Sequence, residues 1–158
     1  MFGWKKAKDG QLTAPVTGQM VSLSDVPDEV FAQKMLGDGG AVKMTGGQIV
    51  SPADGTVTEV TDTLHAYGIT TDSGLDVLVH VGIDTVSLKG EGFTALVKKG
   101  DRVSAGQPLA NVDLAVLQQH DLPLYTPVIV TNMDAVKSIS AETGAAQAGQ
   151  TVLLHYQQ

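Results

Sequence analysis

Residues 65–84, HAYGITTDSGLDVLVHVGID, consist of two β-branched and apolar runs on either side of the turn sequence 71–74. Short runs of this kind, bounded by Asp, Ser and Gly, are typical of antiparallel β-hairpins. Similar runs recur along the chain, at AVKM (41–44), QIVSPADGTVTEV (48–60), TALVKKGDRVSAGQPLANV (94–112), TPVIVTN (126–132) and QTVLLHYQ (150–157). The sequence therefore predicts roughly ten to twelve strands in an all-β fold, an antiparallel β-sandwich or barrel-sandwich hybrid.

Three short segments are expected to form only one or two helical turns. Residues 28–36 follow a proline and end before a glycine, and residues 113–120 and 132–137 each begin with a residue that can cap a helix. No long segment has the 3.6-residue period of an amphipathic helix.

The composition describes an acidic chain of 158 residues with no cysteine and a formal net charge of −7 at pH 7. The length fits one domain, and the lack of cysteine excludes disulfides and thiolate chemistry. An acidic chain repels phosphate backbones, so nucleic-acid binding is not expected. The start lacks the apolar core of a secretory signal and no apolar run could span a membrane, which predicts a cytoplasmic protein. We expect residues 1–10 to form a flexible tail and residues 11–158 a single domain.

The strand that contains His80 is predicted to bury one face. Side chains alternate across a strand, so the odd-numbered residues of 75–81 should face the core. His80 then faces the other way with its even-numbered neighbours. Gly82 leaves room beside the imidazole, and Asp84 adds a carboxylate that can contact a cation on a partner.

His65 is expected to lie next to His80. The same alternation places Thr63, His65 and Tyr67 on one face, where the Thr63 hydroxyl can hydrogen-bond the imidazole. A hairpin through the turn at 71–74 pairs residue 65 with a residue near 80, which brings both imidazoles within side-chain reach. Such a pair can transfer a phosphoryl group, bind a metal such as zinc, or be purely structural, and geometry leaves all three open.

Residues 65–93, HAYGITTDSGLDVLVHVGIDTVSLKGEGF, strongly resemble the active-site region of glucose-type enzyme IIA proteins of the phosphoenolpyruvate-dependent sugar phosphotransferase system. The spacing of the two histidines is that of the family. The likeness extends through residues 14–42, 100–109 and 126–134 and covers nearly the whole chain. It implies an antiparallel β-sandwich with a shallow depression that holds both histidines.

The resemblance also implies a role for each residue of the pair. His80 matches the histidine that is phosphorylated on Nε2, with Nδ1 bonded to the backbone near Gly82. His65 matches a neighbour of that phosphate, held by Thr63. Asp28 and Asp84 match positions that face cationic side chains of the phosphate donor. An apolar docking patch around the depression is implied at Phe31, Met35, Leu36, Leu78 and Val86. This chain departs from some relatives by having Leu78 and Thr61 where they carry aromatic residues.

The function implied is that of a phosphocarrier, with the small carrier protein HPr as donor and the enzyme IIB domain of a sugar permease as acceptor. Such a carrier would be a monomer, would reach the membrane only through the permease and would need no cofactor. Weak zinc binding by His65 and His80, completed by a carboxylate of a partner, is a secondary hypothesis. The sequence does not identify the sugar, because specificity lies in the membrane-spanning enzyme IIC.

Three alternatives compete with this interpretation. A zinc-dependent hydrolase would use the same histidines, although His120 and His155 lie apart from them and provide no third ligand. A biotinyl carrier would be modified at Lys43 of Ala41-Val42-Lys43-Met44. A purely regulatory binding module would have the same fold without phosphotransfer.

Overall fold

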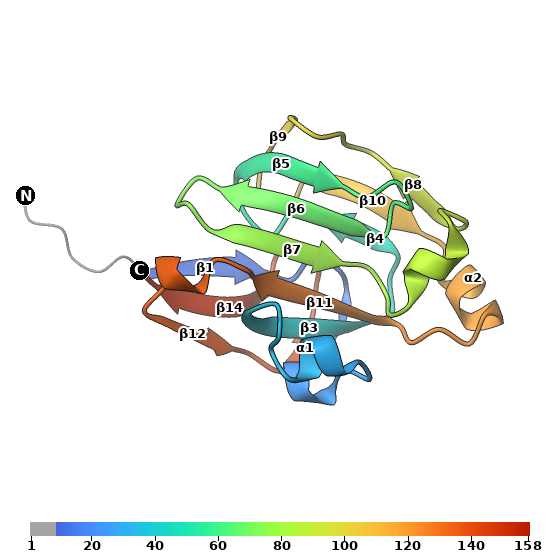
Figure 1. Cartoon of the computed structure of the whole chain (residues 1–158), viewed down its shortest axis with the longest axis horizontal. Helices are drawn as coiled ribbons and strands as arrows, with labels where there is room; N and C mark the ends of the chain where they lie inside the picture. Colours follow the sequence, from blue (N-terminus) through green and yellow to red (C-terminus); the bar gives the residue numbers. More distant parts are fainter. Residues whose placement is uncertain (1–8) are drawn as a thin grey trace, which may run out of the picture.

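The computed structural model describes residues 9–158, which form strands joined by short loops and a few helical turns (Figure 1). The strands are β1 (Asp9–Thr13), β2 (Gly18–Val21), β3 (Asp38–Met44), β4 (Gln48–Val50), β5 (Gly55–Val60), β6 (Ala66–Thr71), β7 (Asp76–His80), β8 (Phe93–Ala95), β9 (Arg102–Val103), β10 (Pro108–Val112), β11 (Tyr125–Val130), β12 (Ser138–Ala141), β13 (Gly144–Ala146) and β14 (Val152–Gln157). The helices are α1 (Glu29–Ala32) and α2 (Leu114–Gln119), with 3-10 turns η1 (Leu23–Asp25), η2 (Thr85–Leu88) and η3 (Met133–Ala135).

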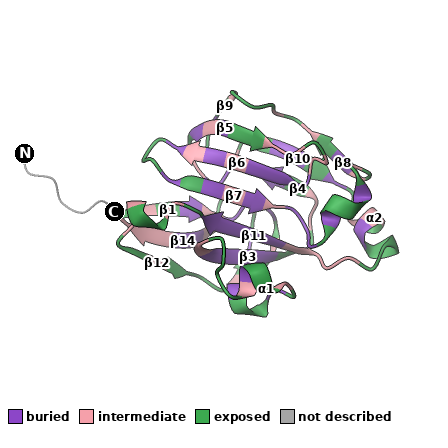
Figure 2. Ribbon diagram, viewed as in Figure 1, coloured by how far each residue is buried: buried purple, intermediate pink, exposed green. Residues whose placement is uncertain are grey.

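The strands form three antiparallel sheets. The large sheet has the order β13-β2-β3-β11-β7-β6-β5-β9, and the two small sheets have the orders β1-β14-β12 and β4-β10-β8. The main core lies between the layers, because one cluster of buried side chains joins Val79 and Val128 of the large sheet to Leu154 and Leu109 of the small sheets. Figure 2 shows this burial concentrated in the central strands, whereas the helical turns and loops are largely exposed. The predicted all-β sandwich is confirmed.

The outer face of the large sheet is partly covered by a second, smaller cluster. The turns η1 and α1 place Leu23 and Phe31 over Ala41 of β3 and Ile129 of β11. Leu78 of β7 packs against the edge of this cluster. The outer face of β7 therefore becomes half-buried where it approaches His80.

The three expected helical segments all contain helical turns, with Asp28 and Asp113 as N-caps of α1 and α2. The turns η1 and η2 have no counterpart among the expectations. The structure assigns fourteen strands to residues 9–158, and the excess over twelve comes from pieces such as β9, which has two residues and no extended apolar run. The predicted tail is too long, because β1 begins at Asp9 and pairs with β14. The rest of that tail, residues 1–8, lies outside the described residues.

Candidate functional site

His80 is the last residue of β7, and its side chain is half-buried. The alternation predicted for this strand is confirmed, with Val77 and Val79 buried and Leu78 and His80 half-buried. The Nδ1 atom lies 2.7 Å from the carbonyl oxygen of Gly82. Because a carbonyl can only accept, Nδ1 carries the proton, and the neutral ring has its lone pair on Nε2.

The Gly82 carbonyl reaches His80 because of an unusual backbone conformation. Gly82 has φ +77, and a Cβ at this position would lie 2.5 Å from Cγ2 of Thr85. A side chain is therefore excluded for both conformational and steric reasons. Gly82 is a requirement of the site geometry, in addition to leaving space beside the ring.

His65 lies against His80, but not by the predicted register. Ala66, rather than His65, is the partner of His80 across β6 and β7. His65 precedes β6 and follows Leu64, which has φ +62, so the backbone leaves the strand conformation there. The two rings are 5.0 Å apart between centroids at an interplanar angle of 77°. The expectation that His65 shares a face with Tyr67 is wrong, because the His65 ring packs against His80 whereas Tyr67 belongs to the main core cluster.

Thr63 orients the His65 ring. Its Oγ1 lies 2.6 Å from Nδ1 of His65, and Oγ1 of Thr61 lies 3.4 Å from the same nitrogen. In the sequence, Thr61 stood out only because some relatives have an aromatic residue at this position. The spacing of four residues between Thr61 and His65 does not by itself predict that the Thr61 hydroxyl contacts the His65 ring.

Burial keeps both imidazoles neutral near pH 7. It lowers the pKa of His65 to about 4, and the proximity of His80 contributes further. Burial also lowers the pKa of His80, but the Gly82 hydrogen bond and the carboxylates of Asp28 and Asp84 oppose this effect. The pair therefore combines a neutral ring with a free Nε2 and a second neutral ring beside it.

The residues expected to surround the pair lie in different environments. Asp28 caps α1 by accepting from the amide of Val30 at 2.9 Å. Asp84 is exposed, with φ +59, at the start of η2. The Phe31 ring is buried and lies 5.0 Å from the His80 ring at 57°, so it supports the site more than it offers a surface. The remaining apolar positions are exposed at Met35 (67%), Leu36 (44%) and Val86 (55%) and half-buried at Leu78.

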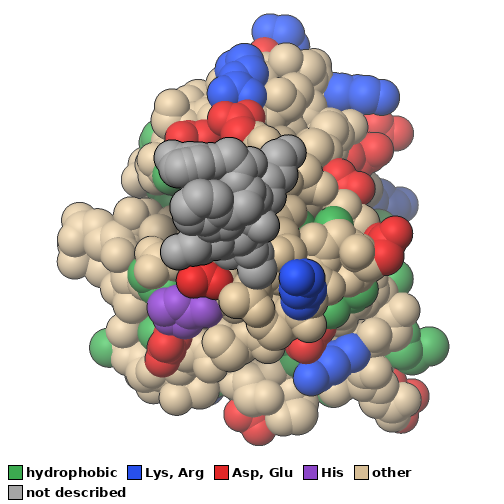
Figure 3. All heavy atoms as spheres, turned by 90° about the vertical axis from the view of Figure 1, so that its left-hand side faces the viewer, with side chains coloured by type: hydrophobic (Ala, Val, Ile, Leu, Met, Phe, Trp, Pro, Cys, Tyr) green, Lys and Arg blue, Asp and Glu red, His purple; other side chains and the backbone are tan. Residues whose placement is uncertain are grey.

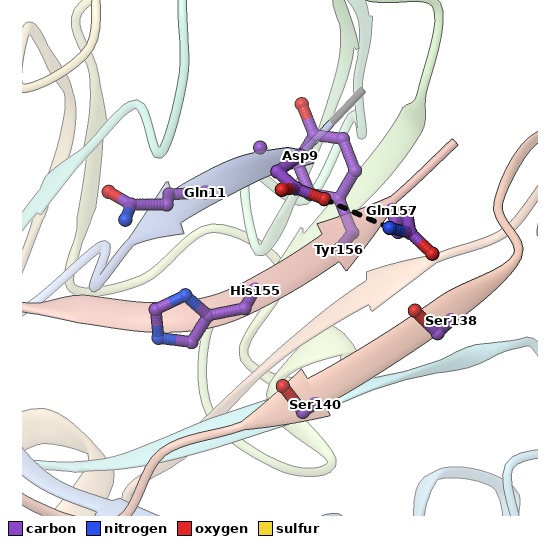
Figure 4. Close-up of a pocket in the computed structure, with 8 residues that line it drawn as sticks. Asp9, Gln11, Ser138, Ser140, His155, Tyr156 and Gln157 are labelled. Carbon is purple, nitrogen blue, oxygen red and sulfur yellow. Dashed lines mark hydrogen bonds between the residues drawn. The ribbon is translucent and has the colours of Figure 1, made fainter. Parts of the chain in front are cut away.

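The other histidines lie away from this pair. A recess on the β1-β14-β12 sheet, shown in Figure 4, is lined by polar side chains that include His155, Gln11 and Ser140. Nε2 of His155 contacts Glu142 at 2.9 Å, and Nε2 of His120 lies 3.5 Å from Glu91. Figure 3 views the left-hand end of Figure 1, where acidic and basic side chains are interspersed. The arrow of β7, whose last residue is His80, points toward the opposite, right-hand end (Figure 1).

Within residues 9–158, no group of three or more His, Asp or Glu side chains is arranged to hold a metal ion. The zinc-hydrolase alternative therefore finds no support in the geometry of the described residues. Lys43, the residue of the biotin alternative, is an exposed residue of β3 that pairs with Gln19 of β2 and Tyr125 of β11. No helix of the same described region is long and apolar enough to cross a membrane.

Comparison with known proteins identifies the family. Residues 10–136 match the family model of the phosphoenolpyruvate-dependent sugar phosphotransferase system, EIIA 1. The chain is 39% identical over 156 residues to the glucose-specific EIIA component of Haemophilus influenzae, covering 98% of this chain and 94% of that protein. It is 43% identical over 157 residues to the glucose-specific EIIA component of Staphylococcus aureus, covering 98% and 95%.

A solved structure and a multidomain relative agree with this result. The glucose permease IIA of Mycoplasma capricolum superimposes with a TM-score of 0.87 at 36% identity, covering 96% of this chain and 99% of that one. The glucoside-specific EIICBA component of Staphylococcus carnosus is 44% identical over 141 residues, which cover 89% of this chain and 20% of that protein. The chain belongs to the EIIA type 1 family of the sugar phosphotransferase system. It is a phosphocarrier, a phosphotransferase component of the glucose-type enzyme IIA class.

Proposed function

We propose that Nε2 of His80 accepts a phosphoryl group from the phosphohistidine of HPr and passes it to the enzyme IIB domain of a sugar permease. The observation that carries this proposal is the 2.7 Å contact of Nδ1 with the Gly82 carbonyl. It leaves Nε2 as the nitrogen with an available lone pair. The bond between phosphorus and the donor nitrogen breaks as the bond from Nε2 to phosphorus forms. Nδ1 keeps its proton, and the Gly82 carbonyl stabilises the positive charge that the phosphorylated ring acquires.

His65 assists this transfer as a hydrogen-bond donor. With the Thr63 hydroxyl donating to Nδ1 of His65 over 2.6 Å, the proton of the neutral ring is on Nε2. That N–H group is then available to the phosphoryl oxygens on the adjacent His80. Preorganised donors of this kind stabilise charge in a transferring group at little reorganisation cost. The low pKa of His65 makes it a neutral donor throughout the physiological range.

The surface around the pair is suited to transient docking. Asp28 and Asp84 form an acidic rim that complements a basic donor and speeds its encounter. Met35, Leu36 and Val86 are exposed, and apolar groups at the centre of a contact area exclude water when a partner binds. We infer that HPr and enzyme IIB use this surface in turn, with the chain acting as a monomer in the cytoplasm.

The acceptor is a permease for glucose or a related glucoside. Relatives over nearly the whole chain are named glucose-specific, and the Staphylococcus carnosus relative is a glucoside-specific EIICBA component. Zinc is not required for this function. His65 and His80 could contribute two ligands to a metal in a partner complex, since the rings are adjacent.

Intact-mass analysis after incubation with phosphoenolpyruvate, enzyme I and HPr tests the proposal. The wild type should gain one phosphoryl group, His80→Ala none, and His155→Ala, on a different sheet, the same as the wild type. His65→Gln should accept the group but deliver it slowly to an enzyme IIB domain. A phosphorylated His80→Ala protein would assign the nucleophile to another residue, and normal delivery by His65→Gln would remove the role of His65.

A further inference from the structure

The loop between β5 and β6 is organised around the hydroxyl group of Thr61. Oγ1 of Thr61 accepts hydrogen bonds from the backbone N–H groups of His65 and Ala66, both at 3.1 Å. The same oxygen lies 3.4 Å from the Ala66 carbonyl oxygen and 3.4 Å from Nδ1 of His65. One side chain therefore contacts the backbone and the ring of His65 together.

This hydroxyl replaces a missing bond of the β-ladder. Val60 pairs with Tyr67, so Thr61 lies opposite Ala66, and the Thr61 N–H donates to the Ala66 carbonyl at 3.2 Å. A regular pair would return a bond from the Ala66 N–H to the Thr61 carbonyl. That carbonyl instead accepts from Leu64 at 2.9 Å and closes a tight turn. The Ala66 N–H takes the Thr61 hydroxyl as its acceptor.

The turn closed in this way determines the direction of His65. Leu64 has φ +62, a conformation that costs a non-glycine residue energy and persists only when its surroundings stabilise it. The turn moves His65 out of line with Tyr67 while its carbonyl still accepts from Val81 at 2.7 Å. His65 is thereby attached to β7 through its carbonyl and to Thr61 through its N–H group.

We propose that Thr61 is a positioning residue for His65, holding the strained 61–65 turn so that the His65 imidazole meets the phosphoryl group on His80. Thr63 then sets the ring orientation, whereas Thr61 sets the backbone from which the ring projects. This inference rests on the proposed role of His65 in transfer. It also gives a function to the threonine at a position where some relatives have an aromatic residue.

Thr61→Val keeps the shape of the side chain and removes the hydroxyl, and Thr61→Ser keeps the hydroxyl. The chain, phosphorylated with phosphoenolpyruvate, enzyme I and HPr, is mixed with the enzyme IIB domain of a glucose permease. We expect Thr61→Val to slow delivery by about fivefold or more and Thr61→Ser to restore it. In the His65→Gln background, Thr61→Val should add nothing, because it acts through His65. Urea denaturation verifies that each variant is folded under the assay conditions.

Imidazole NMR gives a second readout that does not depend on transfer. In Thr61→Val, the pKa of His65 should rise from about 4 toward 6.5 as the ring loses its buried position, and Thr61→Ser should return it. An unchanged His65 titration in Thr61→Val would overturn the positioning role, and so would equal slowing in the wild-type and His65→Gln backgrounds. If His65→Gln itself delivers normally, the proposed function of His65 fails, and the titration alone decides whether Thr61 positions the ring.

Discussion

Replacing Gly82 by alanine should damage both the stability and the chemistry of the site. The residue has φ +77, which costs an L-residue about 1–2 kcal/mol. Its Cβ would lie 2.5 Å from Cγ2 of Thr85 and 3.0 Å from Cδ2 of Leu117. Overpacking of this kind adds about 1–3 kcal/mol, so we expect a total loss of about 2–5 kcal/mol in the free energy of unfolding.

Gly74→Ala is the matched control for this change. Gly74 has φ +94, but no atom of the described residues lies within 4 Å of its Cβ position. Conformational strain alone predicts a loss of about 1–2 kcal/mol there. Urea denaturation of both variants measures the difference, which should be about 1–3 kcal/mol. Equal losses in the two variants would refute the steric argument at Gly82.

The chemical consequence can be measured in the folded protein. Relief of the clash moves the Gly82 carbonyl away from Nδ1 of His80, so the ring loses the bond that fixes its tautomer. A bond worth about 1 kcal/mol corresponds to roughly a fivefold change in rate. We therefore expect phosphoryl acceptance from HPr to slow about fivefold or more in Gly82→Ala and to be unchanged in Gly74→Ala. Acceptance at the wild-type rate by folded Gly82→Ala would show that the carbonyl does not orient the nucleophile.

Three further predictions concern charge and pH. Asp28→Ala should lower the free energy of unfolding by about 1 kcal/mol, because it removes the acceptor of the Val30 amide at the start of α1. Asp28→Asn should lower it less, and urea denaturation measures both changes. Both variants should associate more slowly with HPr in stopped-flow measurements, and the difference from the wild-type rate should shrink at high salt. If the difference did not depend on salt, Asp28 would not attract the donor electrostatically. Because burial lowers the pKa of His80 below 6.5, the rate of acceptance at saturating donor should reach half of its maximum at a pH below 6.5. A midpoint above 6.5 would show a raised pKa. The pKa of His65 is 6.5 in the unfolded chain and about 4 in the folded protein, so the unfolded chain binds an extra proton between these two pH values. The free energy of unfolding should therefore be highest above pH 6.5 and should fall as the pH falls toward 4. Between pH 7.5 and 5 this loss is about 2 kcal/mol in urea denaturation, and His65→Gln should lack it.

The arrangement around His80 could be predicted because it follows regular strand geometry. The alternation of Val77, Val79 and their neighbours needs only a two-residue period and a buried face, and both were present in the sequence. The register of the hairpin was wrong by one residue because its loop is longer than assumed. The Thr71 amide donates to the Leu75 carbonyl at 2.8 Å, which leaves three residues in the loop and moves its centre to Ser73. A loop of this length places Gly74 in the left-handed region, a feature that the sequence TDSG permits without requiring.

The proximity of His65 to His80 was predicted, but the backbone conformation that produces it could not be predicted by the same reasoning. In a regular hairpin with the observed register, His65 would lie opposite Val81 and would face the core with Tyr67. It reaches His80 only because Leu64 adopts a positive φ, and leucine is among the residues that rarely do so. The interactions that stabilise this conformation come from the Thr61 hydroxyl and the Thr61 carbonyl, which belong to a loop with no periodic pattern. The strand pattern did predict that the two rings meet, but through a register that differs by one residue from the observed one.

The two histidines are therefore held by different kinds of structure, and this has a consequence for transfer. His80 is attached to a central strand whose core face is fully buried, so its backbone moves only if the sheet opens. His65 is held by the turn that precedes β6, because its N–H donates to the Thr61 hydroxyl and its carbonyl accepts from the N–H of Val81. In the proposed transfer, the nucleophile must stay in place for two different partners, and the neighbouring donor must be held where the phosphoryl oxygens arrive. The central strand holds His80 and the Thr61 turn holds His65, so separate parts of the fold meet the two requirements.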